Sequence, residues 1–486
     1  MARATTAGAA NETGLLRRLT QWGATAVAFA SCGATAGLFS LYGFSLSSSG
    51  PAFIWGWLLV AIEMGAVVLV FAELASHYPF AGSMYQWPAR LVGERLGWWV
   101  GWLYLFAQIA VLNAVYFVLP LSLIPLFGLP NTLPWQLGIA LGALVVATLV
   151  NGFGVKALGR TSQLGVIAEL IVLVGITSLV LIFGHSQSPR VFLSSGGTAT
   201  SLHQWLPTLF AGGIMVSLWV LYMFETGGTV GEETADARRA APRAIIGAWI
   251  GSVVVGFYFL GAFILSTPDI KKNMASGTPI TDIVNHALPD EFSKLFLALI
   301  AGVTILNANA IFTATSRQLF SMARNGHLPF AKQLARTRNG SPLTAIVVVA
   351  VLTGLPFFVS QQVSVLTIGA TATIYLCYVM VMVFVIIARL RGWPGERAVF
   401  SLGRWGLPIT VFAFVTSLLV ALTLFWPRDS INPVWHFGIR AAYWIVGIPL
   451  IMGAIYYAVA GRHKYAPKNV DVDHSAIITR AASSGE

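Results

Sequence analysis

A series of apolar runs, each about 20 residues long and separated by short polar breaks, constrains this chain more than any other feature. A helix of that length crosses the hydrocarbon core of a bilayer. The composition agrees, since 56% of the 486 residues are hydrophobic and only 10% are charged. A soluble domain carries about 25% charged residues. The sequence therefore predicts an all-α polytopic membrane protein.

About twelve spans are expected, because that many apolar runs are long enough to cross a membrane. Polar tails precede and follow them at 1–20 and 461–486, and the polar segment 82–96 is expected at the membrane interface. The spans are placed at 21–44, 51–72, 97–119, 135–153, 162–184, 206–226, 244–266, 293–316, 343–360, 364–388, 405–426 and 436–460.

The Lys and Arg residues predict the orientation of the chain. Most of the 29 fall in the two tails and in alternate connections between spans, and such residues concentrate on the cytoplasmic side of a membrane. We therefore expect a multi-pass protein of the plasma membrane with both termini in the cytoplasm. This distribution also explains the net charge of +11 without a nucleic-acid partner.

Three acidic residues lie within predicted spans: Glu63, Glu169 and Glu225. A charged side chain at the membrane centre costs roughly 2.5–3.5 kcal/mol on insertion scales, so such residues usually face a cavity or a transport pathway. These three are therefore the first candidates for function. Cys32 and Cys377 both lie in apolar segments, which predicts neither a disulfide nor a metal centre, and no cofactor is expected.

Two of the spans are interrupted by small residues. The first contains SCGATAG at 31–37, and the sixth, five spans later, contains YMFETGG at 222–228. Corresponding breaks in two halves are typical of transporters with inverted repeats, in which unwound backbone lines the substrate site. Alone, SCGATAG would also fit a close contact between two helices in lipid. The pair of breaks favours a binding site.

Four stretches in order along the chain carry a resemblance to a known family. They are SCGATAG, ELASHYPFAGSMYQW at 73–87, ETGGTVGEETADARRAAPRAI from residue 225, and SRQLFSMARNGHLP at 316–329. Together they resemble the amino acid–polyamine–organocation superfamily of transporters, from about residue 20 to residue 345. The ETGGTVGEET form is most similar to the branch that carries amino acids, γ-aminobutyrate (GABA) or choline.

The resemblance implies a leucine-transporter-type fold with a five-plus-five inverted repeat. The first repeat would cover 21–184, the second 206–388, and two extra C-terminal helices 405–460. It also implies a central site for an amine-bearing solute between the first and sixth helices. The implied substrate-binding residues are Ser31, Cys32, Gly33, Ala34, Thr35, Ala36 and Gly37 in the first break, and Tyr222, Met223, Phe224, Glu225, Thr226 and Gly227 in the second.

Glu225 lies at the centre of the second break. A carboxylate there could bind a cationic headgroup or carry a proton, and a carboxyl that ties down the unwound segment by hydrogen bonds is the structural alternative. Tyr222 and Phe224 are expected as walls of the site, since aromatic faces suit amines. Ordinary helix packing would explain the two aromatic residues equally well.

Glu169 occupies a place in the fifth span where some proton-coupled members of this superfamily carry a lysine, close to a sodium site of sodium-coupled members. This reversal of charge leaves proton coupling, Na⁺ coupling and exchange without an ion open. Proton coupling is our expectation, with Glu169 and Glu225 as its residues. An interhelical hydrogen bond is the structural alternative for Glu169. Further pore candidates are Glu63, Gln108, Asn113 and Asn307.

The loop after the sixth span carries Glu232 and Glu233, followed by three arginines at 238, 239 and 243. We expect these side chains to form a solvated ion-pair network that latches the cytoplasmic gate, and a purely structural loop is the alternative. Arg317 and Arg324 follow the eighth span and are explained by topology.

The function expected from these features is secondary active transport by alternating access. An enzyme is not expected, because the spans contain no metalloprotease motif, phosphate loop or cluster of catalytic residues. The N–H groups freed at the first break suit a ligand that bears a carboxylate. Amino acids are therefore the first expected substrates, GABA the second, and choline or a polyamine the third.

Overall fold

The computed structural model of this chain describes residues 19–152, 155–338, 341–358, 363–429, 431–434 and 436–461. Its regular structure within these ranges is helical, and extended pairing is limited to isolated bridges such as Leu19 with Thr234. Most of the first predicted tail and nearly all of the second lie outside the described residues. The predicted all-α class is confirmed.

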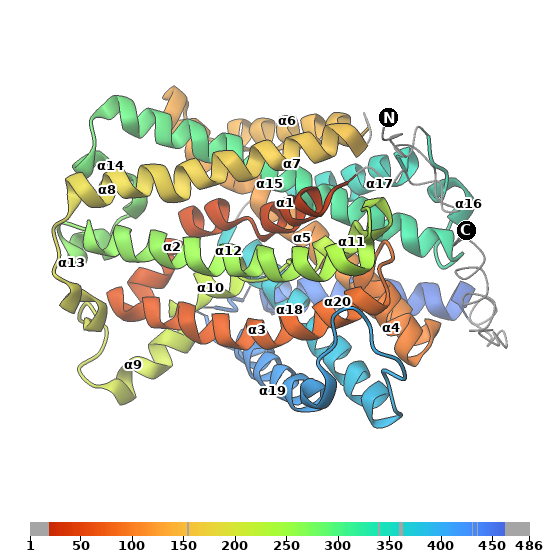
Figure 1. Cartoon of the computed structure of the whole chain (residues 1–486). Helices are drawn as coiled ribbons and strands as arrows, with labels where there is room; N and C mark the ends of the chain where they lie inside the picture. The colour runs from red at the N-terminus through yellow and green to blue at the C-terminus, as the bar shows by residue number, and fades with distance from the viewer. Residues whose placement is uncertain are drawn as a thin grey trace, which may run out of the picture.

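Ten helical segments in the described ranges are long and apolar enough to cross a membrane. They run roughly side by side in one bundle (Figure 1). Their helices are α1 (Gln21–Cys32) continued by α2 (Ala34–Ser49), α3 (Ile54–His77), α5 (Glu94–Phe127), α6 (Leu133–Gly152), α7 (Val155–Leu170) continued by α8 (Thr177–Gly184), α12 (Ala237–Leu265), α15 (Asp290–Arg324), α18 (Val363–Leu390), α19 (Gly406–Phe425) and α20 (Ala441–Tyr456).

The other two predicted spans have a different form. The sixth consists of α9 (Leu202–Thr208), which continues through a π-helical segment at Leu209–Gly213 into α10 (Met215–Val220), and of α11 (Thr226–Thr229) after a break. The ninth is the shorter helix α17 (Leu343–Gly354) with a final turn at Leu355–Phe358. Four short helices lie at the two ends of the bundle, with α4 and α16 at the end that Figure 1 shows on the right, called here the α4 end. They are α4 (Ser83–Val92), α13 (Ile270–Met274), α14 (Pro279–Ala287) and α16 (Ala331–Leu334).

The bundle has buried central helices and peripheral helices with apolar outer faces. α5 packs against α15 and α18, while α1 packs against α7 and α12. The most apolar window of α1 and α2 is 83% buried, whereas that of α20 is only 22% buried. Lipid tails cover such exposed apolar faces in a membrane protein, since the bilayer core offers no water. The central position of α1 therefore places the first break inside the protein.

The segment 82–96, expected at the membrane interface, forms α4 and the first turn of α5. α4 buries Tyr85 and Trp87 against the bundle. Close packing of α4 on α5 needs a glycine, since a Cβ atom on Gly101 would lie 2.7 Å from the Cβ atom of Tyr85. The polar residues of this segment thus belong to a short amphipathic helix that covers the α4 end.

Candidate functional site

The first break lies at Gly33. α1 ends at Cys32, and Gly33 adopts a left-handed conformation with φ 60° and ψ 42° before α2 begins at Ala34. A residue without a Cβ atom adopts this conformation at little cost, which explains why glycine stands here. The break exposes the first N–H groups of α2, because the first turn of a helix has no intrahelical acceptors for them.

The second break extends from Leu221 to Glu225, between α10 and α11. Met223 has a left-handed φ of 65°, a strained conformation for a residue with a side chain. α18 holds this strained segment, since the Met223 N–H donates to the Tyr378 hydroxyl at 3.0 Å. The Thr226 hydroxyl donates to the Met223 carbonyl at 2.7 Å. The unwound form is therefore maintained by one side chain from α18 and one from α11.

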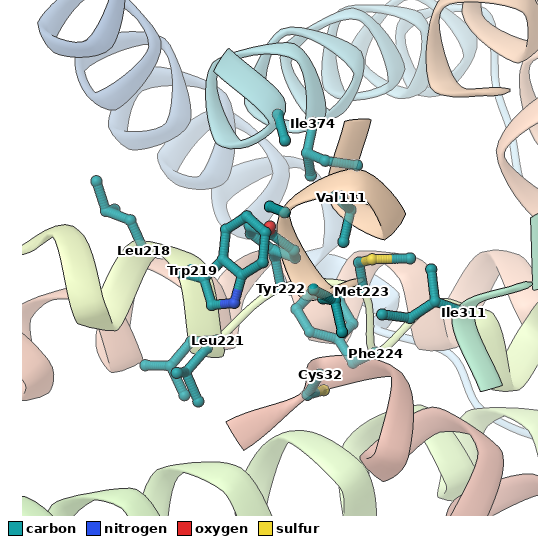
Figure 2. Close-up of a cluster of buried hydrophobic side chains, with 14 of the residues drawn as sticks. Cys32, Val111, Leu218, Trp219, Leu221, Tyr222, Met223, Phe224, Ile311 and Ile374 are labelled. Carbon is teal, nitrogen blue, oxygen red and sulfur yellow. The ribbon is translucent and has the colours of Figure 1, made fainter. Parts of the chain in front are cut away.

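The two breaks lie against each other at distances that only small residues allow. A Cβ atom on Gly37 would lie 2.4 Å from Cδ1 of Trp219, and one on Gly227 would lie 3.2 Å from the Cβ atom of Ala28. Figure 2 shows the apolar side chains around the second break, including Cys32 from α1, Val111 from α5, Ile311 from α15 and Ile374 from α18. The predicted residues of the two breaks are thus brought together, as a site between the first and sixth spans requires.

Glu225 is fully buried, and both of its carboxylate oxygens accept hydrogen bonds. Tyr104 of α5 donates to Oε1, and Tyr378 of α18 donates to Oε2 at 2.6 Å. The Ser83 hydroxyl of α4 donates to the Glu225 carbonyl at 3.4 Å. Glu225 therefore ties the second break to three other helices.

Glu169 is buried beside the first break. Its Oε1 accepts from the Thr35 backbone N–H at 2.9 Å and from Asn307 Nδ2 of α15 at 3.4 Å. Glu169 Oε2 and Asn307 Oδ1 have no partner within the described residues. A carboxyl that is protonated at Oε2 carries an O–H donor in place of a second charged acceptor, so protonation would relieve the crowding of unpaired acceptors here. The arrangement can hold a proton, and it connects α7, α15 and the exposed N–H groups of α2.

The aromatic residues of the second break have different surroundings. Tyr222 packs edge-on against Trp219, with ring centroids 5.4 Å apart. Phe224 packs between Phe71 of α3 and Tyr378, each with centroids 6.1 Å away. Phe224 therefore contacts neighbouring helices, while Tyr222 contacts Trp219 of α10.

The remaining pore candidates lie in the surrounding helices. Glu63 of α3 accepts from the Ser417 hydroxyl of α19 at 2.7 Å, which places it at an interface between α3 and α19. Gln108 is buried in α5, and its amide atoms have no partner in the described part of the chain. Asn113 donates to the carbonyl of Thr353 in α17 at 3.2 Å. Only Asn307 among these four is bonded to Glu169.

The two acids after the sixth span pair with α15 and not with the arginines that follow them in sequence. Arg317 Nε donates to Glu233 Oε1 at 2.8 Å, and both side chains are only 1% exposed. Arg324 donates two hydrogen bonds of 2.8 Å to Glu232. The Leu19 N–H donates to the Glu233 carbonyl at 2.8 Å. The expected solvated network is instead a largely buried cluster, because the fold brings α15 across this loop.

Sequence reasoning missed Tyr104 and Tyr378, which are the partners of Glu225. Both tyrosines are fully buried within apolar spans. A signal was available, since a buried tyrosine hydroxyl needs a hydrogen-bond partner and an intramembrane acid needs donors. That reasoning would have selected tyrosines as partners but could not have shown which of the buried tyrosines reach Glu225.

Comparison with known proteins agrees with this geometry. The chain is 25% identical to the amino-acid permease BAT1 of Arabidopsis thaliana, with 89% of this chain and 92% of that protein covered. It is 25% identical to the branched-chain amino acid permease BcaP of Lactococcus lactis, with 86% and 88% covered. A protein of Macrophomina phaseolina named as an amino acid/polyamine transporter is 27% identical, with 80% and 89% covered.

A solved structure shares the fold. The crystal structure of MhsT in complex with L-phenylalanine superposes with a TM-score of 0.62 and covers 82% of this chain and 97% of its own. At 14% identity, this likeness concerns the fold alone, and it agrees with the predicted leucine-transporter-type architecture. The family model for amino acid permeases matches residues 19–454. The chain therefore belongs to the amino acid permease family, within the amino acid–polyamine–organocation superfamily.

Proposed function

We propose that this protein transports amino acids across the plasma membrane by alternating access, with a proton as co-substrate. The observation that carries the proposal is the pair of facing breaks, with the Glu169 carboxyl bonded to a backbone N–H of the first. Half-helix ends near mid-membrane bind the charged groups of a substrate in transporters with inverted repeats. The proposal assigns 21–184 and 206–388 to the two repeats.

The surroundings of Glu225 support a zwitterionic substrate. A free carboxylate at the second break would favour a cation such as choline or a polyamine. Here both oxygens of Glu225 already accept from tyrosine hydroxyls, while the first break offers N–H groups to a carboxylate. An amino acid fits this combination better than a cation without a carboxylate. The names of the relatives, which are amino acid permeases, point the same way.

The α4 end is proposed to face the cytoplasm, since most of the Lys and Arg residues lie in the connections expected on that side. In this arrangement the buried pair of Arg317 and Glu233, the pair of Arg324 and Glu232, and the contact of Leu19 with Glu233 close the cytoplasmic side. Release of substrate to the cytoplasm would require these contacts to separate. The cluster therefore acts as the gate in the proposed cycle.

The test is uptake into proteoliposomes that contain the purified full-length protein. The panel holds labelled neutral amino acids, GABA, choline and a polyamine, and gradients of pH and Na⁺ are imposed separately. We expect saturable uptake of an amino acid that is stimulated by an acidic exterior and is indifferent to Na⁺. Absence of both uptake and exchange for every amino acid would refute transport, and stimulation by Na⁺ alone would refute proton coupling.

A further inference from the structure

The connection between α15 and α17 presents one large apolar side chain to the outside of the protein. Phe330, at the start of α16, is 77% exposed, and its backbone is left-handed with φ 54° and ψ 30°. Exposure of a phenylalanine ring forgoes the gain of burying it, and a left-handed backbone is strained for a residue with a side chain. Two unfavourable features at one residue indicate that another molecule covers this ring.

Three basic residues follow Phe330 within eight positions: Lys332, Arg336 and Arg338. Together these four residues are called the α16 patch. The three basic side chains are exposed, and none of them forms an ion pair or a hydrogen bond with another described residue. The sequence from 292 to 395 contains no Asp or Glu, so the adjoining chain supplies no carboxylate. The patch therefore carries three unbalanced charges.

Lys332 and Arg336 repel each other. α16 continues as a turn to Arg336, whose N–H donates to the Gln333 carbonyl at 3.2 Å. Side chains four positions apart lie on the same side of a helical turn, and like charges there are destabilising. By contrast, Arg317 and Arg324 of α15 each pair with a glutamate. An anion bound between Lys332 and Arg336 would relieve a repulsion that the described part of the protein does not balance.

The patch lies where the bundle meets the membrane surface. α16 packs against α15 and α17, and Figure 1 shows it at the outer edge of the α4 end. The outer face of α17 is apolar, with Val347, Val351 and Leu355 each more than half exposed, and lipid tails cover such a face. Since α17 begins at Leu343, shortly after Arg338, the patch lies near the level of the lipid headgroups.

We propose that the α16 patch binds an anionic phospholipid, whose phosphate lies between the basic side chains while the Phe330 ring enters the interfacial layer. Lys and Arg near a membrane surface attract anionic lipids, and aromatic rings anchor segments at the level of the headgroups. The α4 end is the end proposed to face the cytoplasm, the side on which anionic lipids give the leaflet its negative potential. The tail at 461–486 is less suited as the occupant, since it carries four basic and three acidic residues. This inference goes beyond the proposed transport and does not rest on the solute carried.

The test uses two photoactivatable lipids with the same acyl chains, phosphatidylglycerol and phosphatidylcholine, each in trace amount in phosphatidylcholine liposomes that contain the full-length protein. Peptide mapping after illumination measures the labelling of residues 325–342. Each Lys or Arg at a membrane surface favours an anionic lipid about fivefold. We therefore expect phosphatidylglycerol to label this segment more than about tenfold better than phosphatidylcholine, and we expect a high salt concentration to reduce the ratio.

Single substitutions test the members of the patch one at a time. Lys332→Gln and Arg336→Gln should each lower the labelling ratio about fivefold. Arg397→Gln is the matched control, since Arg397 is exposed in another connection expected on the same side but stands next to Glu396. The ratio of this control should equal that of the wild type. Phe330→Ser should lower labelling by both probes and keep their ratio.

Phe437 provides a control within the wild type. It is 91% exposed and also left-handed, with φ 54°, but Arg440, the nearest Lys or Arg in the sequence, pairs with Asp429. The two probes should label the segment around Phe437 equally. Labelling of the exposed apolar face of α19 should be the same in every variant, which reports on folding.

Equal labelling of 325–342 by the two probes in the wild type would overturn the proposal. An unchanged ratio in the double variant of Lys332→Gln and Arg336→Gln would overturn it too. Labelling by neither probe would show that another occupant, such as the tail, covers the patch, and the proposal would then be wrong as well.

Discussion

Replacing Glu169 by glutamine separates the structural role of this side chain from its proposed role as the proton carrier. Glu169 Oε1 accepts from the Thr35 N–H at 2.9 Å and from Asn307 Nδ2 at 3.4 Å. The amide oxygen of glutamine can keep both bonds. Its Nε2 replaces Oε2, which has no partner within the described residues, so no hydrogen bond of the wild type is lost. We therefore expect the substitution Glu169→Gln to cost less than about 1 kcal/mol of stability.

Glu169→Ala gives the contrasting case. It removes the acceptor of the Thr35 N–H, and an unsatisfied buried group costs about 1–3 kcal/mol. The cavity left by the lost side chain adds to this cost. The alanine variant should therefore unfold at a lower temperature than the glutamine variant. Only the glutamine variant isolates the loss of the proton from the loss of structure.

The expected size of the transport effect follows from the proton gradient. One pH unit stores about 1.4 kcal/mol for each proton, so coupling to one proton accumulates substrate up to about tenfold. Proteoliposomes that are one unit more acidic outside should approach this ratio with the wild type. With Glu169→Gln the labelled amino acid should only equilibrate, at a ratio near unity, while exchange against internal substrate continues.

Glu63→Gln is the matched control, since Glu63 is also a buried acid but is bonded to Ser417 of α19 and not to a break. This control should still accumulate substrate in response to the pH gradient. Accumulation by Glu169→Gln to the wild-type ratio would refute the assignment of coupling to Glu169. Loss of exchange in a stably folded Glu169→Gln protein would show that the side chain serves binding, which would also contradict the reasoning.

Three further substitutions test the breaks and the gate. Gly37→Ala places a Cβ atom 2.4 Å from Trp219 and should reduce uptake more than about tenfold, and wild-type uptake would contradict the close contact of the breaks. Arg317→Met leaves buried Glu233 without its cation and should lower the free energy of unfolding by about 3–5 kcal/mol. Thermal unfolding measures this loss, and the double variant with Glu233→Met should recover stability. Tyr378→Phe removes the hydroxyl that bridges the backbone and the carboxylate of the second break. It should cost about 1–3 kcal/mol and weaken the apparent affinity for substrate, whereas unchanged stability and affinity would show that the bridge is dispensable.

The sequence predicted the helical class, the positions of the long spans and the two breaks. Hydropathy suffices for the spans because backbone groups in lipid must be bonded within a helix. The break at Gly33 could be predicted from local sequence, since a left-handed residue between two helices favours glycine. The left-handed conformation of Met223 could not be predicted from local sequence, because its positive φ is held by Tyr378 of a distant span.

The partners of the charged residues could not be predicted in the same way. Glu232 and Glu233 precede a run of arginines, yet they pair with Arg324 and Arg317 of α15. Sequence proximity failed here because the packing of α15 across the loop decides which cation approaches. The same limit applies to Asn113, which lines an outer groove, since position along an apolar helix does not by itself select one face.

By itself, the sequence determined that this chain crosses the membrane many times and is interrupted twice, because hydrophobic length and glycine conformation are local properties. The tertiary structure decided that Glu225 is held by Tyr104 and Tyr378, and that Glu169 is bonded to the first break. These contacts join residues separated by more than a hundred positions. Only the packing of whole helices sets the distance between such groups, and that distance decides whether a buried acid meets a hydroxyl, an amide or a substrate.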